Sequence, residues 1–208
     1  MALIVLLGAQ AVGKMTVGKE LENRIDGKLL FNHQTLDLFA NFLGYSKSAF
    51  MLSDKTRKEL FKAFVNNTEN NTTKTIIFTV VIDFDLAYDI EFLHDIADIF
   101  LAANQEIYFI ELVAALRERL KRNVHEERLK MKPSKRDTKF SRKELLTSAK
   151  RNRLESRDHE LETLFPTVHH LKINNTRLSP EEVCHQIITC FQRLYKDWQI
   201  RYFLRLLR

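Results

Sequence analysis

The sequence predicts an α/β domain of three layers, doubly wound around a parallel sheet of five strands. Short apolar runs alternate with longer amphipathic stretches along the 208 residues, which is typical of strands that alternate with helices. The run TIIFTVVI (75–82) is β-branched or apolar throughout, as expected for a parallel strand covered by helices on both faces. A chain of this length suits a single domain, which we expect over residues 1–208.

The first elements each have a clear pattern. ALIVLL (2–7) is six residues long, lacks a basic leader and runs straight into a glycine loop, so it predicts a buried strand rather than a secretion signal. The stretch from Lys14 to Arg24 has the spacing of an amphipathic helix. KLLFN (28–32) predicts a second strand, and two amphipathic helices are expected to follow at 35–44 and 54–67.

The second half of the chain repeats this alternation. Further strands are expected at 75–83, 106–113 and 169–174, and further helices at 87–103, 115–130 and 179–195. The last helix has a favourable start, because Ser179 can cap it, Pro180 suits its first position, and Glu181 and Glu182 lie in its first turn.

Composition narrows the class of protein. Hydrophobic residues make up 45% and charged residues 29%, with only 5 Gly and 3 Pro, which is typical of a helix-rich globular protein. Cys184 and Cys190 match no metal or redox motif and indicate core thiols in a reducing cytoplasm. No apolar run approaches the roughly 20 residues that a membrane span needs.

The net charge of +6 is concentrated in one segment. Residues 117–157 hold 16 Lys or Arg against 6 Asp or Glu, a local balance of +10 that leaves −4 for the rest of the chain. This distribution favours a local anionic ligand over a generally cationic surface.

The stretch GAQAVGKMT (8–16) has the spacing of a phosphate-binding loop, with Gly8, four residues, Gly13 and Lys14. A strand precedes it and a helix starts at once, so backbone N–H groups and the positive helix end would face phosphate. The alternative is a glycine turn between strand and helix with no ligand.

Several segments resemble the nucleoside-monophosphate-kinase-like and shikimate-kinase-like group of P-loop kinases. GKMT resembles the GKGT of adenylate-kinase-like sequences, RLKR (119–122) resembles the RLxxR that enters their lid, and LKINNTRLSPEEVCHQI (171–187) resembles their last strand, ligand-facing turn and final helix. Two positions depart from the family: Met15 replaces a glycine, and Ala11 replaces the middle glycine of GxxGxGK. The similarity covers most of residues 1–195.

This resemblance implies ATP and Mg²⁺ as ligands. Lys14 would stabilise the transferring phosphate, Thr16 would lie near Mg²⁺ or a phosphate, and Arg119 would face the nucleotide base or a phosphate. The cofactor-binding cradle would comprise Gly8, Ala9, Gln10, Ala11, Val12, Gly13, Lys14, Met15 and Thr16. Arg122, shifted by one place from the family pattern, is a catalytic candidate.

TVVIDFD ends its strand with two acids. Asp83 would emerge beside the loop, where it could orient the water shell of Mg²⁺ or accept a hydroxyl proton. The alternative is an acid that caps a helix or is solvated. Asp85 is a weaker candidate for binding the substrate.

The acceptor site of the kinase group starts where FNHQT closes the second strand, and we expect acceptor-binding helices over 33–70. Asn32 and His33 could bind the acceptor, with Asp37 one helical turn further on. Many relatives that phosphorylate a hydroxyl place an aspartate at this strand end, so its absence leaves the general base unassigned. A structural role is the alternative for the histidine.

A lid is expected over 123–142, where Pro133 and a basic run interrupt the helical periodicity. Arg128, Lys135 and Arg136 are lid candidates, while Arg153 and Arg157 resemble arginines that return to the transferring phosphate. Arg136 and Arg157 are taken as substrate-binding, because the planar guanidinium binds phosphate oxygens in two places. For each of these, a solvated helix face is the alternative.

The tail KDWQIRYFLRLLR (196–208) alternates basic and large apolar residues at helical spacing. We expect it to pack against the domain or a second subunit, which would give a homodimer through the C-terminal helix. A membrane surface is the less favoured alternative.

The expected function is a kinase that moves the γ-phosphoryl of ATP to a small-molecule or nucleotide acceptor. Neither a DGFPR-like nucleotide signature nor the glycine-rich acceptor loop of shikimate kinases is present, so the acceptor stays open. The alternatives are an NTPase or switch without an acceptor, although no NKxD-like motif occurs, and a nucleic-acid-binding protein. Nucleic acid is the less expected partner, because Phe140 is the sole aromatic residue of the basic segment.

Overall fold

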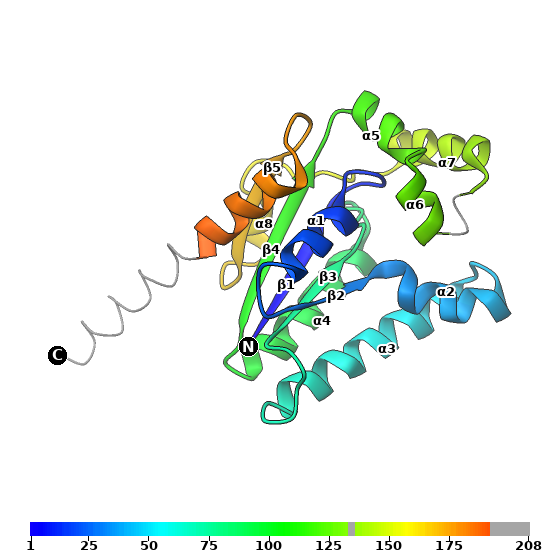
Figure 1. Cartoon of the computed structure of the whole chain (residues 1–208). Coiled ribbons are helices and arrows are strands. Elements are labelled where there is room, and N and C mark those ends of the chain that lie inside the picture. The colour runs from blue at the N-terminus through cyan, green and yellow to red at the C-terminus, as the bar shows by residue number, and fades with distance from the viewer. Residues whose placement is uncertain (133–135, 192–208) are drawn as a thin grey trace.

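The computed structural model describes residues 1–132 and 136–191, which form a parallel sheet with helices on both faces (Figure 1). The five strands lie in the order β2-β3-β1-β4-β5, which confirms the predicted doubly wound sheet. The strands are β1 (Ala2–Leu7), β2 (Lys28–Phe31), β3 (Thr75–Thr79), β4 (Glu106–Val113) and β5 (His169–Asn174). The expected lid and C-terminal contact fall partly or wholly on residues 133–135 and 192–208, outside the described residues.

Helices cover the sheet in two layers. They are α1 (Lys14–Glu22), α2 (Asn32–Leu43), α3 (Lys47–Asn66), α4 (Ala87–Ala102), α5 (Leu116–Asn123), α6 (Glu126–Met131), α7 (Thr138–Arg151), α8 (Glu160–Leu164) and a helix over 180–191. None of these described helices has an apolar stretch sufficient to cross a membrane.

The side chains of β1 alternate between two hydrophobic cores. Leu3, Val5 and Leu7 pack in the core that α3, α4 and α8 cover. Ile4 and Leu6 pack on the opposite face with residues of α1 and of the helix over 180–191. Burial of β1 on both faces explains why its sequence is apolar without alternation.

A glycine allows α1 to lie close to β2. A Cβ atom added at Gly18 would be 2.5 Å from Leu29 Cδ1, so any other residue would displace the Leu29 side chain or move the helix away from the strand. Helix α1, which follows the glycine loop, is therefore seated directly on the neighbouring strand.

Some elements differ from the sequence prediction. β3 ends at Thr79 instead of Asp83, because the chain turns away after Val80 N–H donates to the Leu6 carbonyl. The helix expected over 115–130 is divided into α5 and α6, with Val124 and His125 between them. Helix α7 begins inside the expected irregular segment, where the Asp137 side chain accepts a hydrogen bond from Phe140 N–H.

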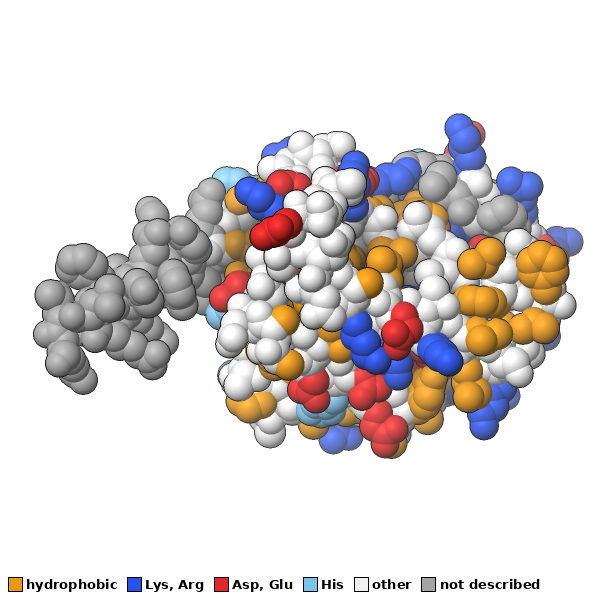
Figure 2. Space-filling view, turned by 90° about the horizontal axis from the view of Figure 1, so that it is seen from below, with side chains coloured by type: hydrophobic (Ala, Val, Ile, Leu, Met, Phe, Trp, Pro, Cys, Tyr) orange, Lys and Arg blue, Asp and Glu red, His pale blue; other side chains and the backbone are white. Residues whose placement is uncertain are grey.

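All five strands are parallel, so their carboxyl ends meet at one edge of the sheet, where doubly wound folds bind ligands. Helices α5, α6 and α7 lie on one side of this edge, with α2 and α3 on the other (Figure 1). Hydrophobic side chains gather on the α2–α3 side of the molecule (Figure 2). The exposed ones there are Leu38, Phe42, Leu43, Tyr45, Phe50, Met51 and Leu52.

Candidate active site

The glycine loop between β1 and α1 has the backbone that its sequence motif requires. Gly8 and Gly13 have φ angles of 134° and 109°, which favour glycine. A Cβ at Gly8 would also collide with the Leu112 carbonyl oxygen. The helix then begins at Lys14, so its first backbone N–H groups face the end of the loop.

The two departures from the family pattern have different consequences. Ala11, in place of a glycine, has a φ of 59°, a left-handed conformation that costs a side-chain-bearing residue about 1–2 kcal/mol. Met15 is buried and packs inside the domain, whereas the neighbouring Thr16 is exposed at the start of α1. The hydroxyl expected two places after the lysine is therefore accessible at Thr16.

Lys14 is folded back onto its own loop. Its Nζ donates hydrogen bonds to the carbonyls of Gly8 and Ala9, the latter at 2.9 Å. Burial, and then the positive charges of Lys132, Arg128 and Arg119, lower the pKa of Lys14 well below its usual value. An anion bound here would relieve this repulsion, so the electrostatics favour a phosphate-bearing ligand.

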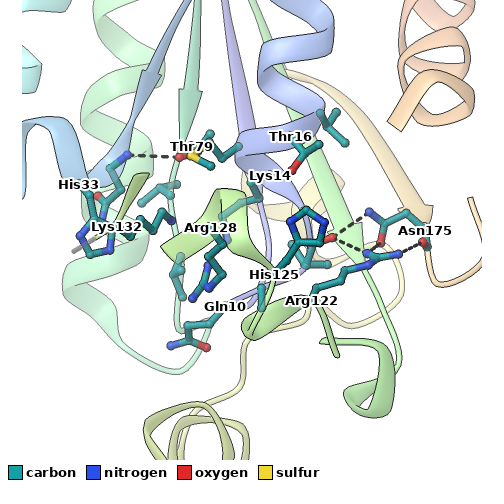
Figure 3. A pocket seen from close by; sticks show the side chains of 18 of the residues that line it. Gln10, Lys14, Thr16, His33, Thr79, Arg122, His125, Arg128, Lys132 and Asn175 are labelled. Atoms are coloured by element: carbon teal, nitrogen blue, oxygen red, sulfur yellow. Dashed lines mark hydrogen bonds between the residues drawn. The ribbon is translucent and has the colours of Figure 1, made fainter. Parts of the chain in front are cut away.

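A cavity of about 440 Å³ opens above the loop (Figure 3). Four groups of elements form its walls. The glycine loop and the end of β3 form two of them, the start of α2 and the start of α3 with the connection between them form the third, and α5, α6 and the turn after β5 form the fourth. The lining includes residues 10–17, Asn32, His33, Leu36, Tyr45, Phe50, residues 79–81, Arg122, His125, Arg128, Lys132, Glu144, Asn175, Leu178, Pro180 and Val183.

The two arginines of the RLKR segment both bind carbonyls of the glycine loop. Arg119 Nε donates to the Gln10 carbonyl at 2.8 Å, and its buried Nη2 has no hydrogen-bond partner among the described residues. Arg122 donates to the carbonyls of Val12 at 2.8 Å and Asn175 at 2.9 Å. Arg122 lines the cavity, whereas Arg119, which was expected to face the nucleotide, does not.

The remaining basic candidates separate into two groups. Arg128 and Lys132 line the cavity; burial lowers the pKa of Arg128, and its buried Nε has no partner among the described residues. Arg136 is exposed and donates to the Leu129 carbonyl, and Arg157 is exposed at the turn before α8. Neither Arg136 nor Arg157 lines the cavity, and Lys135 lies outside the described residues.

The structure does not bring Asp83 and Asp85 to the loop. The Asp83 carboxylate accepts hydrogen bonds from the backbone N–H groups of Asp85 and Arg153, each at 3.1 Å. Asp85 accepts from Arg153 Nε at 2.8 Å, and Arg153 also pairs with Glu160. These acids therefore hold two loops together, a role that differs from both the metal site and the capping or solvated acid considered from the sequence. This role was not foreseen because β3 ends four residues earlier than expected.

Two of the residues expected to bind an acceptor, Asn32 and His33, reach the cavity, whereas Asp85, Arg136 and Arg157 do not line it. Asn32 and His33 begin α2 and line the cavity. His33 lies opposite Arg122 (Figure 3). Asn32 N–H donates to Thr79 Oγ1 at 3.2 Å, which ties the start of α2 to the end of β3. His33 Nδ1 lies 2.9 Å from Asp37 Oδ1, one helical turn further on.

Sequence reasoning missed several residues of this site. Tyr45 and Phe50 line it from the segment between α2 and α3 and from α3 itself, and His125 lines it from the break between α5 and α6. No motif marks them, because they reach the cavity through tertiary packing. Asn175 was detectable in part, since it lies in the NNT turn that resembles the ligand-facing turn of the kinases; its Nδ2 donates to the Val12 carbonyl at 2.9 Å.

The part of the chain that the structure describes has no magnesium site made of protein ligands alone. Within residues 1–132 and 136–191, no cluster of three or more His, Cys, Asp or Glu could hold a metal ion. Magnesium commonly binds through one or two protein oxygens together with substrate phosphates and water. The exposed Thr16 hydroxyl at the cavity fits this mode of binding.

Comparison with known proteins identifies the fold. No protein-family model and no curated protein sequence matches the chain. A gluconokinase from Sinorhizobium meliloti 1021 is 10% identical with a TM-score of 0.59, over 96% of this chain and 97% of that one. A sugar kinase from Janibacter sp. HTCC2649 is 14% identical with a TM-score of 0.57, over 92% and 95%.

A third structure gives the same result. The shikimate kinase from Acinetobacter baumannii, solved in complex with shikimate, is 16% identical with a TM-score of 0.50, over 92% of this chain and 93% of that one. These likenesses, each over nearly the whole length of both chains, show that the chain has the P-loop kinase fold, as its resemblance to the shikimate-kinase-like group predicted.

Proposed function

We propose that this protein is a kinase that uses ATP and Mg²⁺ and transfers the γ-phosphoryl group to a small-molecule or nucleotide acceptor. The observation that carries the proposal is one continuous cavity. It joins the glycine loop and Lys14 to the cations Arg128 and Lys132 on one side and to Asn32 and His33 on the other. A donor phosphate and an acceptor can therefore meet in a single space.

The donor half of the cavity is suited to a triphosphate. Backbone N–H groups of the loop and of the start of α1 would bind phosphate oxygens. Lys14 would exchange its contacts with the Gly8 and Ala9 carbonyls for the β and γ phosphates. Mg²⁺, held by Thr16 together with phosphate oxygens and water, would neutralise charge that develops on the transferring group.

Arg122 would act on the shape of the loop rather than on the phosphate. Its guanidinium already binds the carbonyls of Val12 and Asn175 and the carboxylate of Glu118. The positive charges nearest to a phosphate would then come from Lys14, Arg128 and Lys132. This assignment replaces Arg122 with Arg128 as the arginine that contacts the transferring group.

The reaction would conserve all atoms of donor and acceptor. The acceptor oxygen forms a bond to the γ phosphorus while the bond from phosphorus to the β–γ bridging oxygen breaks, and that electron pair stays on ADP. Catalysis then depends on holding the two groups in line and on neutralising charge.

Two other functions remain as outcomes of the test. An NTPase or switch would bind nucleotide without an acceptor. The cavity extends beyond the loop to α2, which favours a second bound molecule and hence a kinase over an NTPase or switch. A nucleic-acid-binding protein would use an exposed basic surface, and the residues Lys139, Arg142, Lys143 and Lys150 do share one face of α7. That face has no stacking platform, since Phe140 is the sole aromatic side chain of α7.

The first experiment measures MgATP binding by calorimetry for the intact protein, for Lys14→Ala and for Lys150→Ala. Lys150 is exposed on α7 and outside the cavity, so it controls for the loss of one positive charge. We expect binding in the intact protein and the control and a loss of at least tenfold in Lys14→Ala. An intact protein that binds neither MgATP nor MgGTP would refute the kinase, and a salt-sensitive shift with RNA or DNA would then favour the basic face.

We also propose that the protein works in a reducing compartment such as the cytoplasm. Cys184 is buried, Cys190 is partly buried, and no disulfide joins them. Burial raises the pKa of the Cys184 thiol to about 12, which suits an unreactive core thiol.

A further inference from the structure

We infer that His33 is the general base of this kinase, that Asp37 is its positioning residue, and that the acceptor is a hydroxyl-bearing compound. This inference rests on the proposed kinase function and deepens it, because it assigns the proton acceptor and the chemical class of the acceptor. The kinases that the chain resembles often use an aspartate where β2 ends, and this chain has no acid there.

His33 and Asp37 form a hydrogen-bonded pair with the geometry of a base and its orienting carboxylate. His33 Nδ1 lies 2.9 Å from Asp37 Oδ1 within one turn of α2, and the His33 side chain is only 13% exposed. A carboxylate beside Nδ1 favours the tautomer with hydrogen on that nitrogen, which leaves Nε2 as the basic atom. Tyr45 donates its hydroxyl to the same Asp37 oxygen at 3.0 Å, and this second bond fixes the carboxylate.

The first turn of α2, which carries His33, is held rigidly by hydrogen bonds to its neighbours. Arg57 is 3% exposed and donates to the Asn32 carbonyl at 2.9 Å and to Thr35 Oγ1 at 2.7 Å. Asn32 N–H donates in turn to Thr79 Oγ1. The first turn of α2 is thus bound to both α3 and β3, so His33 is held in a defined place relative to the end of the sheet. A general base needs this kind of fixed geometry.

His33 lies in the cavity where it can face an acceptor bound beside the glycine loop. His33 lines the same cavity as Lys14 and Thr16, and it lies across from Asn175 and Arg122 in Figure 3. An acceptor seated between His33 and the loop could be deprotonated at one side while it is phosphorylated from the other. The charged groups around His33 are Asp37 on its own helix, Lys132 at the end of α6, the buried Arg57 of α3 and the positive end of α2.

The walls beside His33 favour an alcohol over a nucleotide. Leu36, Tyr45 and Phe50 form an apolar and aromatic surface, which suits the carbon skeleton of a small hydroxylated compound. Arg57 cannot bind a phosphate of a nucleotide acceptor, because its guanidinium is buried. Besides its contacts with α2, its Nη1 donates a hydrogen bond of 2.8 Å to Asp54 Oδ1. The residues of α2 and α3 that line the cavity include no arginine.

The inferred reaction transfers one proton to His33 and one phosphoryl group to the acceptor. The acceptor O–H bond breaks and its proton goes to His33 Nε2, while the acceptor oxygen bonds to the γ phosphorus. The bond between that phosphorus and the β–γ bridging oxygen breaks with its electron pair left on ADP. The proton on His33 is then released to water, and the product is a phosphate monoester.

The test uses the full chain and MgATP with two kinds of acceptor. Water serves as the first acceptor, because a base in this position would also activate water, and ADP release measures its attack. The second is a panel of D-gluconate, shikimate, glycerol, AMP and UMP, with ³¹P NMR to distinguish a phosphate monoester from a phosphoanhydride. Variants are His33→Ala, His33→Gln and Asp37→Asn. His185→Ala is the matched control, because His185 is exposed on the helix over 180–191.

We expect His33→Ala and His33→Gln to lower kcat by roughly 100-fold or more, the usual contribution of a general base, with the Kd for MgATP changed less than threefold. The acid limb of the pH profile of kcat should disappear. Asp37→Asn should lower kcat and leave KM for ATP unchanged. A merely structural histidine would alter thermal stability without removing that limb.

Other outcomes would overturn the inference. Unchanged kcat in both His33 variants, or a panel in which only AMP or UMP is phosphorylated to a phosphoanhydride, would refute the general base and the alcohol. These failures differ from failure of the kinase itself, in which the intact protein would not bind MgATP. If one His33 variant does not fold, the kcat of the other variant and the pH profile of Asp37→Asn decide whether His33 is the general base.

Discussion

The guanidinium of Arg122 donates a hydrogen bond of 2.8 Å to the carbonyl of Val12, at the centre of the glycine loop. The same side chain donates to the Asn175 carbonyl at 2.9 Å, and Asn175 Nδ2 donates back to Val12. Three segments that are far apart in the sequence therefore meet at one carbonyl. The loop is shaped before a ligand arrives, which is the condition for preorganised binding.

Replacement of Arg122 should damage both stability and binding. We expect Arg122→Met to lower the free energy of unfolding by about 2–3 kcal/mol, because charge-assisted hydrogen bonds to carbonyls are lost. MgATP affinity should fall by roughly tenfold or more, equivalent to at least about 1.4 kcal/mol. Chemical denaturation and calorimetry measure the two effects. Arg117→Met, at an exposed position of the same helix, should change the free energy of unfolding by less than about 0.5 kcal/mol.

The left-handed conformation of Ala11 gives a prediction of opposite sign. Ala11→Gly should raise the free energy of unfolding by about 0.5–1 kcal/mol, because relief of the strained φ of 59° outweighs the extra entropy of glycine in the unfolded chain. Ala9→Gly is the control, since Ala9 is not among the residues with positive φ. It should lower stability instead. Equal effects at the two positions would show that the strain is absent.

The partly buried cation Lys14 should make the ligand-free protein less stable near neutral pH. Its pKa is lowered on folding, so between that lowered value and its ordinary pKa of about 10.4 the unfolded chain holds more protons. The stability of the intact protein should therefore rise with pH through this window. Lys14→Met removes the effect, and we expect its Tm to be roughly 2–4 °C higher at pH 7, with the difference shrinking towards pH 10.

Thermal unfolding at several pH values, with and without tripolyphosphate, measures this difference. Tripolyphosphate should stabilise the intact protein more than Lys14→Met, because it compensates the charges of Lys14, Arg128 and Lys132. A variant that is less stable than the intact protein at pH 7 would contradict the argument from electrostatic repulsion.

Asp83 should matter for stability and not for magnesium. Its carboxylate accepts hydrogen bonds from two backbone N–H groups, so Asp83→Ala should lower the free energy of unfolding by about 1–3 kcal/mol. The Kd for MgATP should change less than twofold. Asp158→Ala, at an exposed position before α8, controls for the loss of one negative charge. Retained stability with weakened dependence on Mg²⁺ would restore Asp83 as a metal-site residue.

Sequence patterns predicted the sheet and the glycine loop because both depend on local order. β1 is apolar on both faces, and the loop needs glycine at Gly8 and Gly13 for backbone reasons that the sequence displays directly. These features follow from residues that are neighbours in the chain.

The parts that sequence patterns did not predict depend on contacts between distant residues. Nothing near Arg57 indicates that it is buried against Asn32 and Thr35. The end of β3 was placed too late because VVID continues the apolar pattern after the chain has left the sheet. Arg119 was expected to face the nucleotide but does not line the cavity, because only the folded loop decides which guanidinium reaches it.

The hydrogen bond from Asn32 N–H to Thr79 Oγ1 has a consequence for how such a protein diversifies. The start of α2 is hydrogen-bonded to β3, and α1 packs closely on Leu29 of β2 at Gly18. The elements that would bind the phosphate donor and those that would bind the acceptor are therefore joined through the same sheet. Substitutions at Leu36, Tyr45 or Phe50 would then alter the preferred acceptor while the nucleotide platform stays in place. Selection could thus change the substrate through a few side chains, without a new backbone and without loss of the phosphate loop.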